Sequence, residues 1–109
     1  MLSKDRRVSR SEFKLLNRPL KTLSGKLFSA KVYKTDQKIS KFAFSISKKI
    51  EKKAVLRNKM RRMAYNTVQD SQNILKSAFL FHFFLNKKPK NIKDDITNDI
   101  NNILHDFLS

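Results

Sequence analysis

The residues best suited to chemistry in this chain lie between residues 48 and 62, where the sequence reads KKIEKKAVLRNKMRR. A helix that begins near residue 53 places Arg57, Arg61 and Tyr65 in one row, because side chains four residues apart share a helix face. Asn58 and Arg62 lie beside this row. Guanidinium groups bind phosphate oxygens through two parallel hydrogen bonds. This face therefore predicts a surface that contacts phosphates.

The same helix has an apolar side that can pack against a core. Leu56, Met60, Met63 and Thr67 recur at helical spacing away from the arginines. A helix packed on one side holds the cations of its other side in fixed positions. Further cations that we expect near phosphates are Lys48, Lys49, Lys52, Lys53 and Lys59.

The charge of the whole chain agrees with a polyanionic partner. The formal net charge is +16, and residues 1–62 carry all of it because residues 63–109 hold equal numbers of acids and bases. Nucleic acid is the commonest polyanion that offsets such a charge. A solvated basic surface and a patch for anionic lipid are the alternatives.

Residues for protein-only hydrolysis are lacking. The nine acidic residues are scattered, none clusters near His82 or His105, and the chain has no cysteine. We read both histidines as structural. The basic start lacks the apolar segment of a secretory signal, and the longest apolar run, residues 78–85, is too short to span a bilayer. We expect a cytoplasmic protein with no membrane partner and no small-molecule cofactor.

Local patterns predict one domain over residues 1–109, with residues 1–8 as a flexible basic arm. Ser9 and Glu12 fit a capping box for a short helix that ends before Pro19. Residues 27–34 and 42–47 alternate as strands, and the turn at 35–38 predicts that they form an antiparallel hairpin. The basic helix follows over residues 53–70.

The last part of the chain predicts a strand and a helix. Residues 78–85 (AFLFHFFL) suit an interior strand covered on both faces. Asn91 can cap a final helix whose buried stripe runs from Ile92 to Leu108. The fold class is α+β, with three helices packed on a small mixed sheet.

The motif residues also carry a family resemblance. Ser47-Lys48-Lys49-Ile50, followed by Ala54-Val55-Leu56-Arg57-Asn58-Lys59-Met60-Arg61-Arg62, resembles the signature of the bacterial ribonuclease P protein component. The acidic-Phe pair Glu12-Phe13, Phe28 at a strand start and the terminal amphipathic helix extend the resemblance over nearly the whole chain.

The resemblance implies a subunit of a ribonucleoprotein that removes the 5′ leader from precursor tRNA. Its partners would be ribonuclease P RNA, which supplies the active site and its Mg²⁺ ions, and precursor tRNA. It implies a left-handed β-α-β crossover, and a cleft for the single-stranded leader near Phe13, Phe28 and Lys31. It further implies RNA contacts by Asn58 beside Arg57.

Some positions depart from the family pattern. Lys59 stands where an arginine is usual, Tyr65 follows the motif where an Arg or Glu is common, and Asn17 replaces an aromatic. Lys31 stands where an aromatic would face the leader. Leader contacts are therefore expected to be more electrostatic than in the family at large.

Two other functions remain open from the sequence. A non-catalytic RNA-binding module, such as a ribosomal protein, would carry the same charge and the same salt dependence. DNA binding is a weaker alternative, because no helix-turn-helix or dimer seam is visible.

Overall fold

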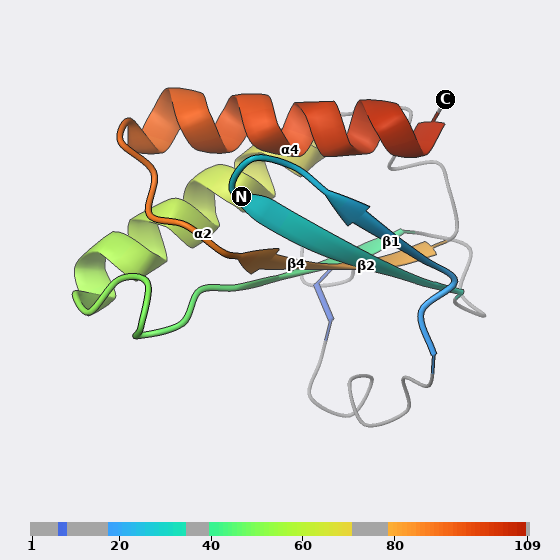
Figure 1. Cartoon of the computed structure of the whole chain (residues 1–109), viewed down its shortest axis with the longest axis horizontal. Coiled ribbons are helices and arrows are strands. Elements are labelled where there is room, and N and C mark those ends of the chain that lie inside the picture. Colours follow the sequence, from blue (N-terminus) through green and yellow to red (C-terminus); the bar gives the residue numbers. More distant parts are fainter. Residues whose placement is uncertain (1–6, 9–17, 35–39, 71–78, 109) are drawn as a thin grey trace.

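The computed structural model describes residues 7–8, 18–34, 40–70 and 79–108 (Figure 1). The expected helix of residues 9–17, and Phe13 with it, lies outside these ranges. Within these ranges the elements are four strands and two helices: β1 Lys21–Ser24, β2 Phe28–Lys34, β3 Lys41–Ser45, α2 Ala54–Gln69, β4 Phe79–Leu85 and α4 Ile92–Leu108. Helix α2 agrees with the expected 53–70 within one residue at each end.

The strands form one mixed sheet in the order β1-β2-β4-β3. Strand β4 runs antiparallel to β2, with Phe28 opposite Leu85, and parallel to β3, with Phe44 opposite Phe83. The expected hairpin of residues 27–34 with 42–47 is therefore wrong, because β4 lies between the two strands. The most apolar strand takes the central place, and the sequence Thr35-Asp36-Gln37-Lys38 lacks the Asn-Gly or Asp-Gly pair typical of a tight hairpin.

Strand β3, helix α2 and strand β4 form a parallel β-α-β unit, as the pairing of β3 with β4 requires a long connection. The mixed α+β fold that we expected is present. The hand of this connection stays a prediction.

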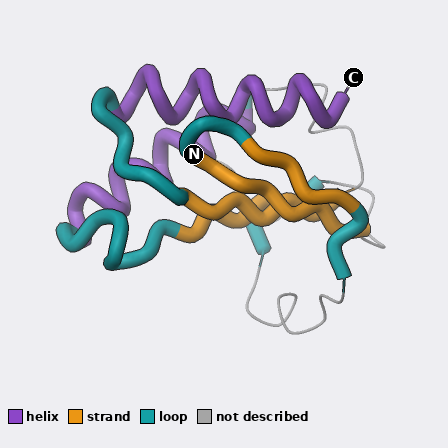
Figure 2. Tube along the Cα trace, in the orientation of Figure 1, coloured by secondary structure: helices purple, strands orange, loops and turns teal. Residues whose placement is uncertain are grey.

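Both helices cover the same face of the sheet (Figure 2). From α2, Met60, Ala64 and Val68 enter the core, and α4 contributes its isoleucine stripe. The sheet supplies most of the aromatic surface. The fully buried large apolar side chains are Phe28, Phe42, Phe81, Phe83, Met60, Ile96, Ile100, Ile103, Val32 and Val68.

The two faces of strand β4 differ in burial along residues 81–85. Phe81, Phe83 and Leu85 are buried under the helices, whereas His82 and Phe84 point to the opposite face and are partly exposed. The expectation of a strand covered on both faces is therefore wrong at His82 and Phe84, whereas Leu80 on the same side is only 3% exposed. Alternation along the strand places its successive side chains on opposite sides.

The buried carboxylate of Asp99 links α4 to the β1–β2 turn through hydrogen bonds. Asp99 accepts hydrogen bonds from the backbone N–H groups of Lys26, Leu27 and Phe28, at 2.6, 3.1 and 2.8 Å. A Cβ atom on Gly25 would come within 2.6 Å of the Asp99 Oδ1. The single glycine of the chain is thus placed where the turn meets this carboxylate.

The end of the expected basic arm pairs with the sheet. Arg7 forms a parallel bridge with Phe42, and the Val8 N–H donates to the Phe42 carbonyl at 3.1 Å. This pairing brings the Arg7 side chain to the exposed edge strand β3, near helix α2.

Candidate nucleic-acid interface

Helix α2 presents its cations on the side away from the sheet. Asn58, Lys59 and Arg62 are exposed, whereas Arg57, Arg61 and Tyr65 are half-buried. Because Met60 and Ala64 anchor the opposite side of the helix in the core, the polar side is held in a fixed orientation. The arrangement expected from the spacing is therefore present.

Arg57 makes contacts that the spacing did not predict. Its Nη1 donates to the carbonyl oxygens of Glu51 and Lys52, at 2.9 and 2.8 Å. These two hydrogen bonds hold the loop before α2 against the first turn of the helix. Arg57 consequently has a structural role in shaping the basic loop, in addition to its charge.

A pocket of about 390 Å³ lies at the exposed side of α2. The Arg61 Nη2 donates to the Asn58 Oδ1, which fixes both side chains beside it. Arg7 reaches the same pocket from the sheet edge, and its Nε is buried without a hydrogen-bond partner in the described structure. Three guanidinium groups therefore surround one hollow. Its lining residues are Arg7, Asn58, Arg61, Arg62 and Tyr65.

The ring of Tyr65 belongs partly to the core. It meets Phe44 edge to face, with ring centroids 4.9 Å apart. Burial raises the pKa of Tyr65 above its ordinary value, so the hydroxyl stays protonated near neutral pH and can donate a hydrogen bond at the pocket. This half-buried position limits the ring surface that a base could stack on.

Residues 47–53 form a loop before α2, the lysine loop, which is organised by Glu51. This buried carboxylate accepts the Lys53 N–H at 3.2 Å and forms an ion pair with the Lys88 Nζ at 3.3 Å. The backbone hydrogen bond from Lys53 is the main cause that lowers the pKa of Glu51. Around this anchor, the predicted cations Lys48, Lys49, Lys52 and Lys53 all remain exposed.

The sheet face opposite the helices carries a second group of polar and aromatic side chains. Lys31 is exposed, and its Nζ lies 5.4 Å from the ring centroid of Phe84. The rings of Phe84 and His82 are 3.9 Å apart, and the His82 Nε2 lies 2.7 Å from the Ser45 Oγ. The sequence predicts that residues 78–85 are covered on both faces, which would bury both rings. Strand alternation in residues 79–85 was the signal that could have placed them on this surface.

Phe28 does not belong to this surface. It has no exposed area and packs edge to face against Phe44 and Phe83, at 6.3 and 6.2 Å. The expected leader contact of Phe28 is therefore corrected to a core role, because position 28 points to the helix-covered face. Lys31 lies opposite His82 in the sheet and points to the face that the helices do not cover, the open face.

The environment of His82 predicts a pH-dependent stability. Burial, together with the charge of Lys31, lowers the pKa of His82 from 6.5 to about 4. The unfolded chain therefore binds one more proton than the folded chain between these values, and stability falls as pH falls through this window. Discounted for the partial exposure of the ring, the loss should be about 1–2 kcal/mol.

Urea denaturation at about pH 7 and about pH 4.5 measures this effect. His82→Gln should remove part of the pH-dependent loss, whereas His105→Gln, at an exposed position on α4, should retain it. The same pH dependence in wild type and His82→Gln would contradict the assignment.

The sequence comparisons decide the family. The family model described as Ribonuclease P matches residues 1–107, which is nearly the whole chain. The chain belongs to the ribonuclease P protein family. No curated protein sequence matches it.

Solved structures of ribonuclease P proteins share its fold. A Staphylococcus aureus RNase P protein mutant, described as defective in mRNA degradation activity, is 20% identical, with a TM-score of 0.77 over 96% of this chain and 90% of that one. Another S. aureus RNase P protein structure is 20% identical, with a TM-score of 0.71 over 94% of each chain. The Thermotoga maritima RNase P protein, in complex with 1-(4-fluorophenyl)-2-thiourea, is 17% identical, with a TM-score of 0.60 over 81% of this chain and 82% of that one.

Membership in the ribonuclease P family supports a role as the protein subunit of ribonuclease P in tRNA processing. The recognition made from residues 47–62 is thereby confirmed. Within the described ranges, neither helix is long and apolar enough to cross a membrane.

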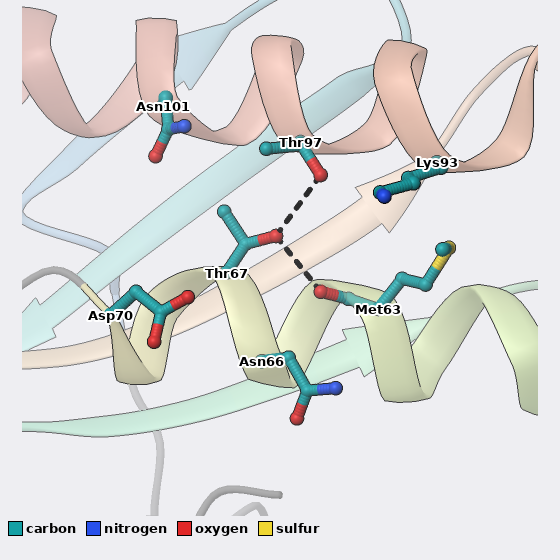
Figure 3. Close-up of a pocket in the computed structure, with 7 residues that line it drawn as sticks. All are labelled: Met63, Asn66, Thr67, Asp70, Lys93, Thr97 and Asn101. Carbon is teal, nitrogen blue, oxygen red and sulfur yellow. Dashed lines mark hydrogen bonds between the residues drawn. The ribbon is translucent and has the colours of Figure 1, made fainter.

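One hollow of this ribonuclease P protein lies away from the predicted cations. It has a volume of about 590 Å³ and lies between α2 and α4 (Figure 3). Thr67 bridges the helices there, donating to the Met63 carbonyl at 2.8 Å and lying 3.5 Å from the Thr97 hydroxyl. Asp70 is the one acidic residue of its lining, so the hollow offers no pair of carboxylates for acid–base work.

No group of His, Asp or Glu side chains among the described residues could hold a metal ion. Where the structure is described, the protein therefore does not supply a ligand set for Mg²⁺.

Proposed function

We propose that this chain binds ribonuclease P RNA and precursor tRNA, and assists the RNA-catalysed removal of the tRNA 5′ leader. The observation that carries the proposal is the pocket where Arg7, Arg61 and Arg62 meet beside Asn58. Arginine is always charged and its planar fork matches phosphate oxygens, so a fixed cluster of arginines suits the closely spaced phosphates of a folded RNA.

The RNA subunit would contact the exposed side of α2 and the lysine loop before it. Arg57 holds this loop against the helix, and Glu51 holds it toward Lys88. Such preorganisation reduces the entropy that is lost when flexible lysines become ordered on binding. The site residues would then be the predicted cations of residues 48–62, with Arg7 added by the structure.

The single-stranded leader would lie on the open face of the sheet. Lys31 supplies a charge for phosphate there, and the adjacent rings of His82 and Phe84 supply a surface for base stacking. Stacking of one base on an aromatic ring is worth about 1–3 kcal/mol. Stacking thus supplements the electrostatic contacts expected from the sequence. Phe13 stays a predicted leader contact.

The chemistry in this proposal belongs to the RNA subunit, which would hold the Mg²⁺ ions of the active site. The protein would position the two RNAs and screen the repulsion between their phosphates. No bond is made or broken by a protein side chain. The cytoplasm is the predicted location.

A cleavage assay with the separate and combined subunits tests this division of roles. The purified protein alone should not cleave precursor tRNA at any Mg²⁺ concentration. Added to its cognate RNA subunit, it should lower the Mg²⁺ concentration needed for half-maximal cleavage. Cleavage by protein freed of RNA, or an unchanged Mg²⁺ requirement, would contradict the proposal.

A further inference from the structure

A second cationic pocket shares no lining residue with the arginine pocket. Its volume is about 530 Å³, and four lysines line it: Lys26 of the β1–β2 turn, and Lys87, Lys88 and Lys90 of the loop between β4 and α4. All four are exposed. The loop between β4 and α4 reads Lys87-Lys88-Pro89-Lys90, and its proline ends the apolar strand.

The topology explains why these lysines meet. Phe28 at the start of β2 lies opposite Leu85 at the end of β4, so the β1–β2 turn and the β4–α4 loop share one end of the sheet. Strand β3 ends at the same edge because it runs parallel to β4. The lysine loop that follows β3 therefore lies at this end as well, as Figure 1 shows at its left.

The two carboxylates of the pocket are already engaged by backbone groups. The Asp95 Oδ2 accepts the N–H groups of Lys90 and Asn91, at 3.0 and 2.9 Å. Asp99 accepts the three N–H groups of the β1–β2 turn. Lys26, Lys87 and Lys90 are exposed and form no ion pair with any described residue.

Lys88 connects this pocket to the lysine loop. Its Nζ reaches Glu51, the carboxylate that organises residues 47–53. The amides of Asn98 and Asn102, one turn apart on α4, also line the pocket and add neutral hydrogen-bonding groups. The Lys88–Glu51 ion pair therefore joins the loop before α4 to the loop before α2.

We infer that this pocket is a further phosphate-binding site, at which Lys26, Lys87 and Lys90 contact the backbone of the RNA subunit. The inference rests on the proposed function and extends its RNA interface from α2 to the β1–β2 turn and the β4–α4 loop. Phosphate fits the chemistry because the four lysines of the lining outnumber its two aspartates, and two amides face the same hollow. We assign the contact to the RNA subunit because the pocket adjoins the lysine loop, whereas the leader is placed on the sheet.

Binding of the isolated RNA subunit at several salt concentrations tests the inference. The variant Lys87→Gln/Lys90→Gln should weaken binding roughly tenfold at about 0.1 M salt, and should reduce the slope of log Kd against log salt by about 1–2. The charge-matched control Lys34→Gln/Lys93→Gln changes exposed lysines outside both cationic pockets. It should bind nearly as the wild type does.

The outcomes separate this inference from the proposed function. If the wild-type chain does not bind the RNA subunit, both are overturned. If the wild type binds and the Lys87→Gln/Lys90→Gln variant keeps the wild-type affinity and slope, only the inference is overturned. A loss seen with precursor tRNA alone, and not with the RNA subunit, overturns the assignment to the RNA subunit.

A proximity measurement provides an independent readout. The chain has no cysteine, so Lys87→Cys creates a single attachment point for an iron chelate that cleaves nearby RNA by hydroxyl radicals. We expect cuts in the RNA subunit from position 87 and none from Lys34→Cys. Absence of cuts from position 87, in a complex that Arg62→Cys does cut, would overturn the inference.

Discussion

Replacing Arg61 and Arg62 together with alanine is expected to weaken binding of the RNA subunit by about 100-fold. Each arginine would lose charge-assisted hydrogen bonds worth about 1.5 kcal/mol, and each 1.4 kcal/mol is a factor of about ten in affinity. Within the described residues, the side-chain hydrogen bond that this change removes is the one from Arg61 to Asn58. The helix should therefore remain folded, and alanine favours helix.

Cleavage of precursor tRNA at low Mg²⁺ by the reconstituted complex is the second readout for this variant. The Arg61→Ala/Arg62→Ala protein should need more Mg²⁺ than the wild type, whereas Lys34→Ala/Lys93→Ala, which removes the same charge elsewhere, should not. Thermal unfolding of both variants near the wild-type temperature confirms that the fold is intact. Unchanged processing by the arginine variant would count against the interface.

Replacing Phe83 with alanine is expected to lower the free energy of unfolding by about 3–5 kcal/mol. The ring has no exposed area and stacks on Phe44, with centroids 4.8 Å apart. Its removal leaves a cavity at the centre of the sheet, where the surrounding aromatic rings cannot close fully. Urea denaturation measures the loss.

The neighbouring Phe84→Ala is the matched control for this substitution. Phe84 is partly exposed on the open face, so its loss should cost well under half as much stability. Equal destabilisation by the two changes would contradict the assignment of β4 as a strand with one buried and one open face.

The helices could be predicted because their signals are local. The apolar spacing of Met60, Ala64 and Val68 locates the inner side of α2, and the isoleucines of residues 92–108 locate that of α4. The cations of α2 then follow from helix geometry alone. Helical periodicity needs no knowledge of what the helix packs against.

The sheet order could not be predicted from local pattern. Residues 27–34 and 42–47 are adjacent strands in the sequence, and adjacent strands often pair. Their separation by β4 depends on a long-range preference, in which Phe81 stacks on Phe42 and Phe83 packs against Phe28 and Phe44. Nothing in either strand alone indicates this arrangement.

The structure also adds site residues whose roles arise only from tertiary contacts. Arg7 reaches the arginine pocket because its backbone pairs with Phe42. Arg57 turns back to two loop carbonyls, and Asp99 reaches a turn more than seventy residues away. The contacts of Arg7 and Asp99 join segments distant in sequence, so composition and spacing carry no signal for them.

Purification of the native protein from its own cells, followed by sequencing of the RNA that accompanies it, tests the central claim most directly. The claim is that the cationic side of α2 and its loop bind the RNA of a tRNA-processing ribonucleoprotein. Ribonuclease P RNA should be the main RNA recovered with the wild type and should be depleted with Arg61→Ala/Arg62→Ala. Recovery of ribosomal subunits, with no ribonuclease P RNA, would contradict the account and favour the ribosomal-protein alternative.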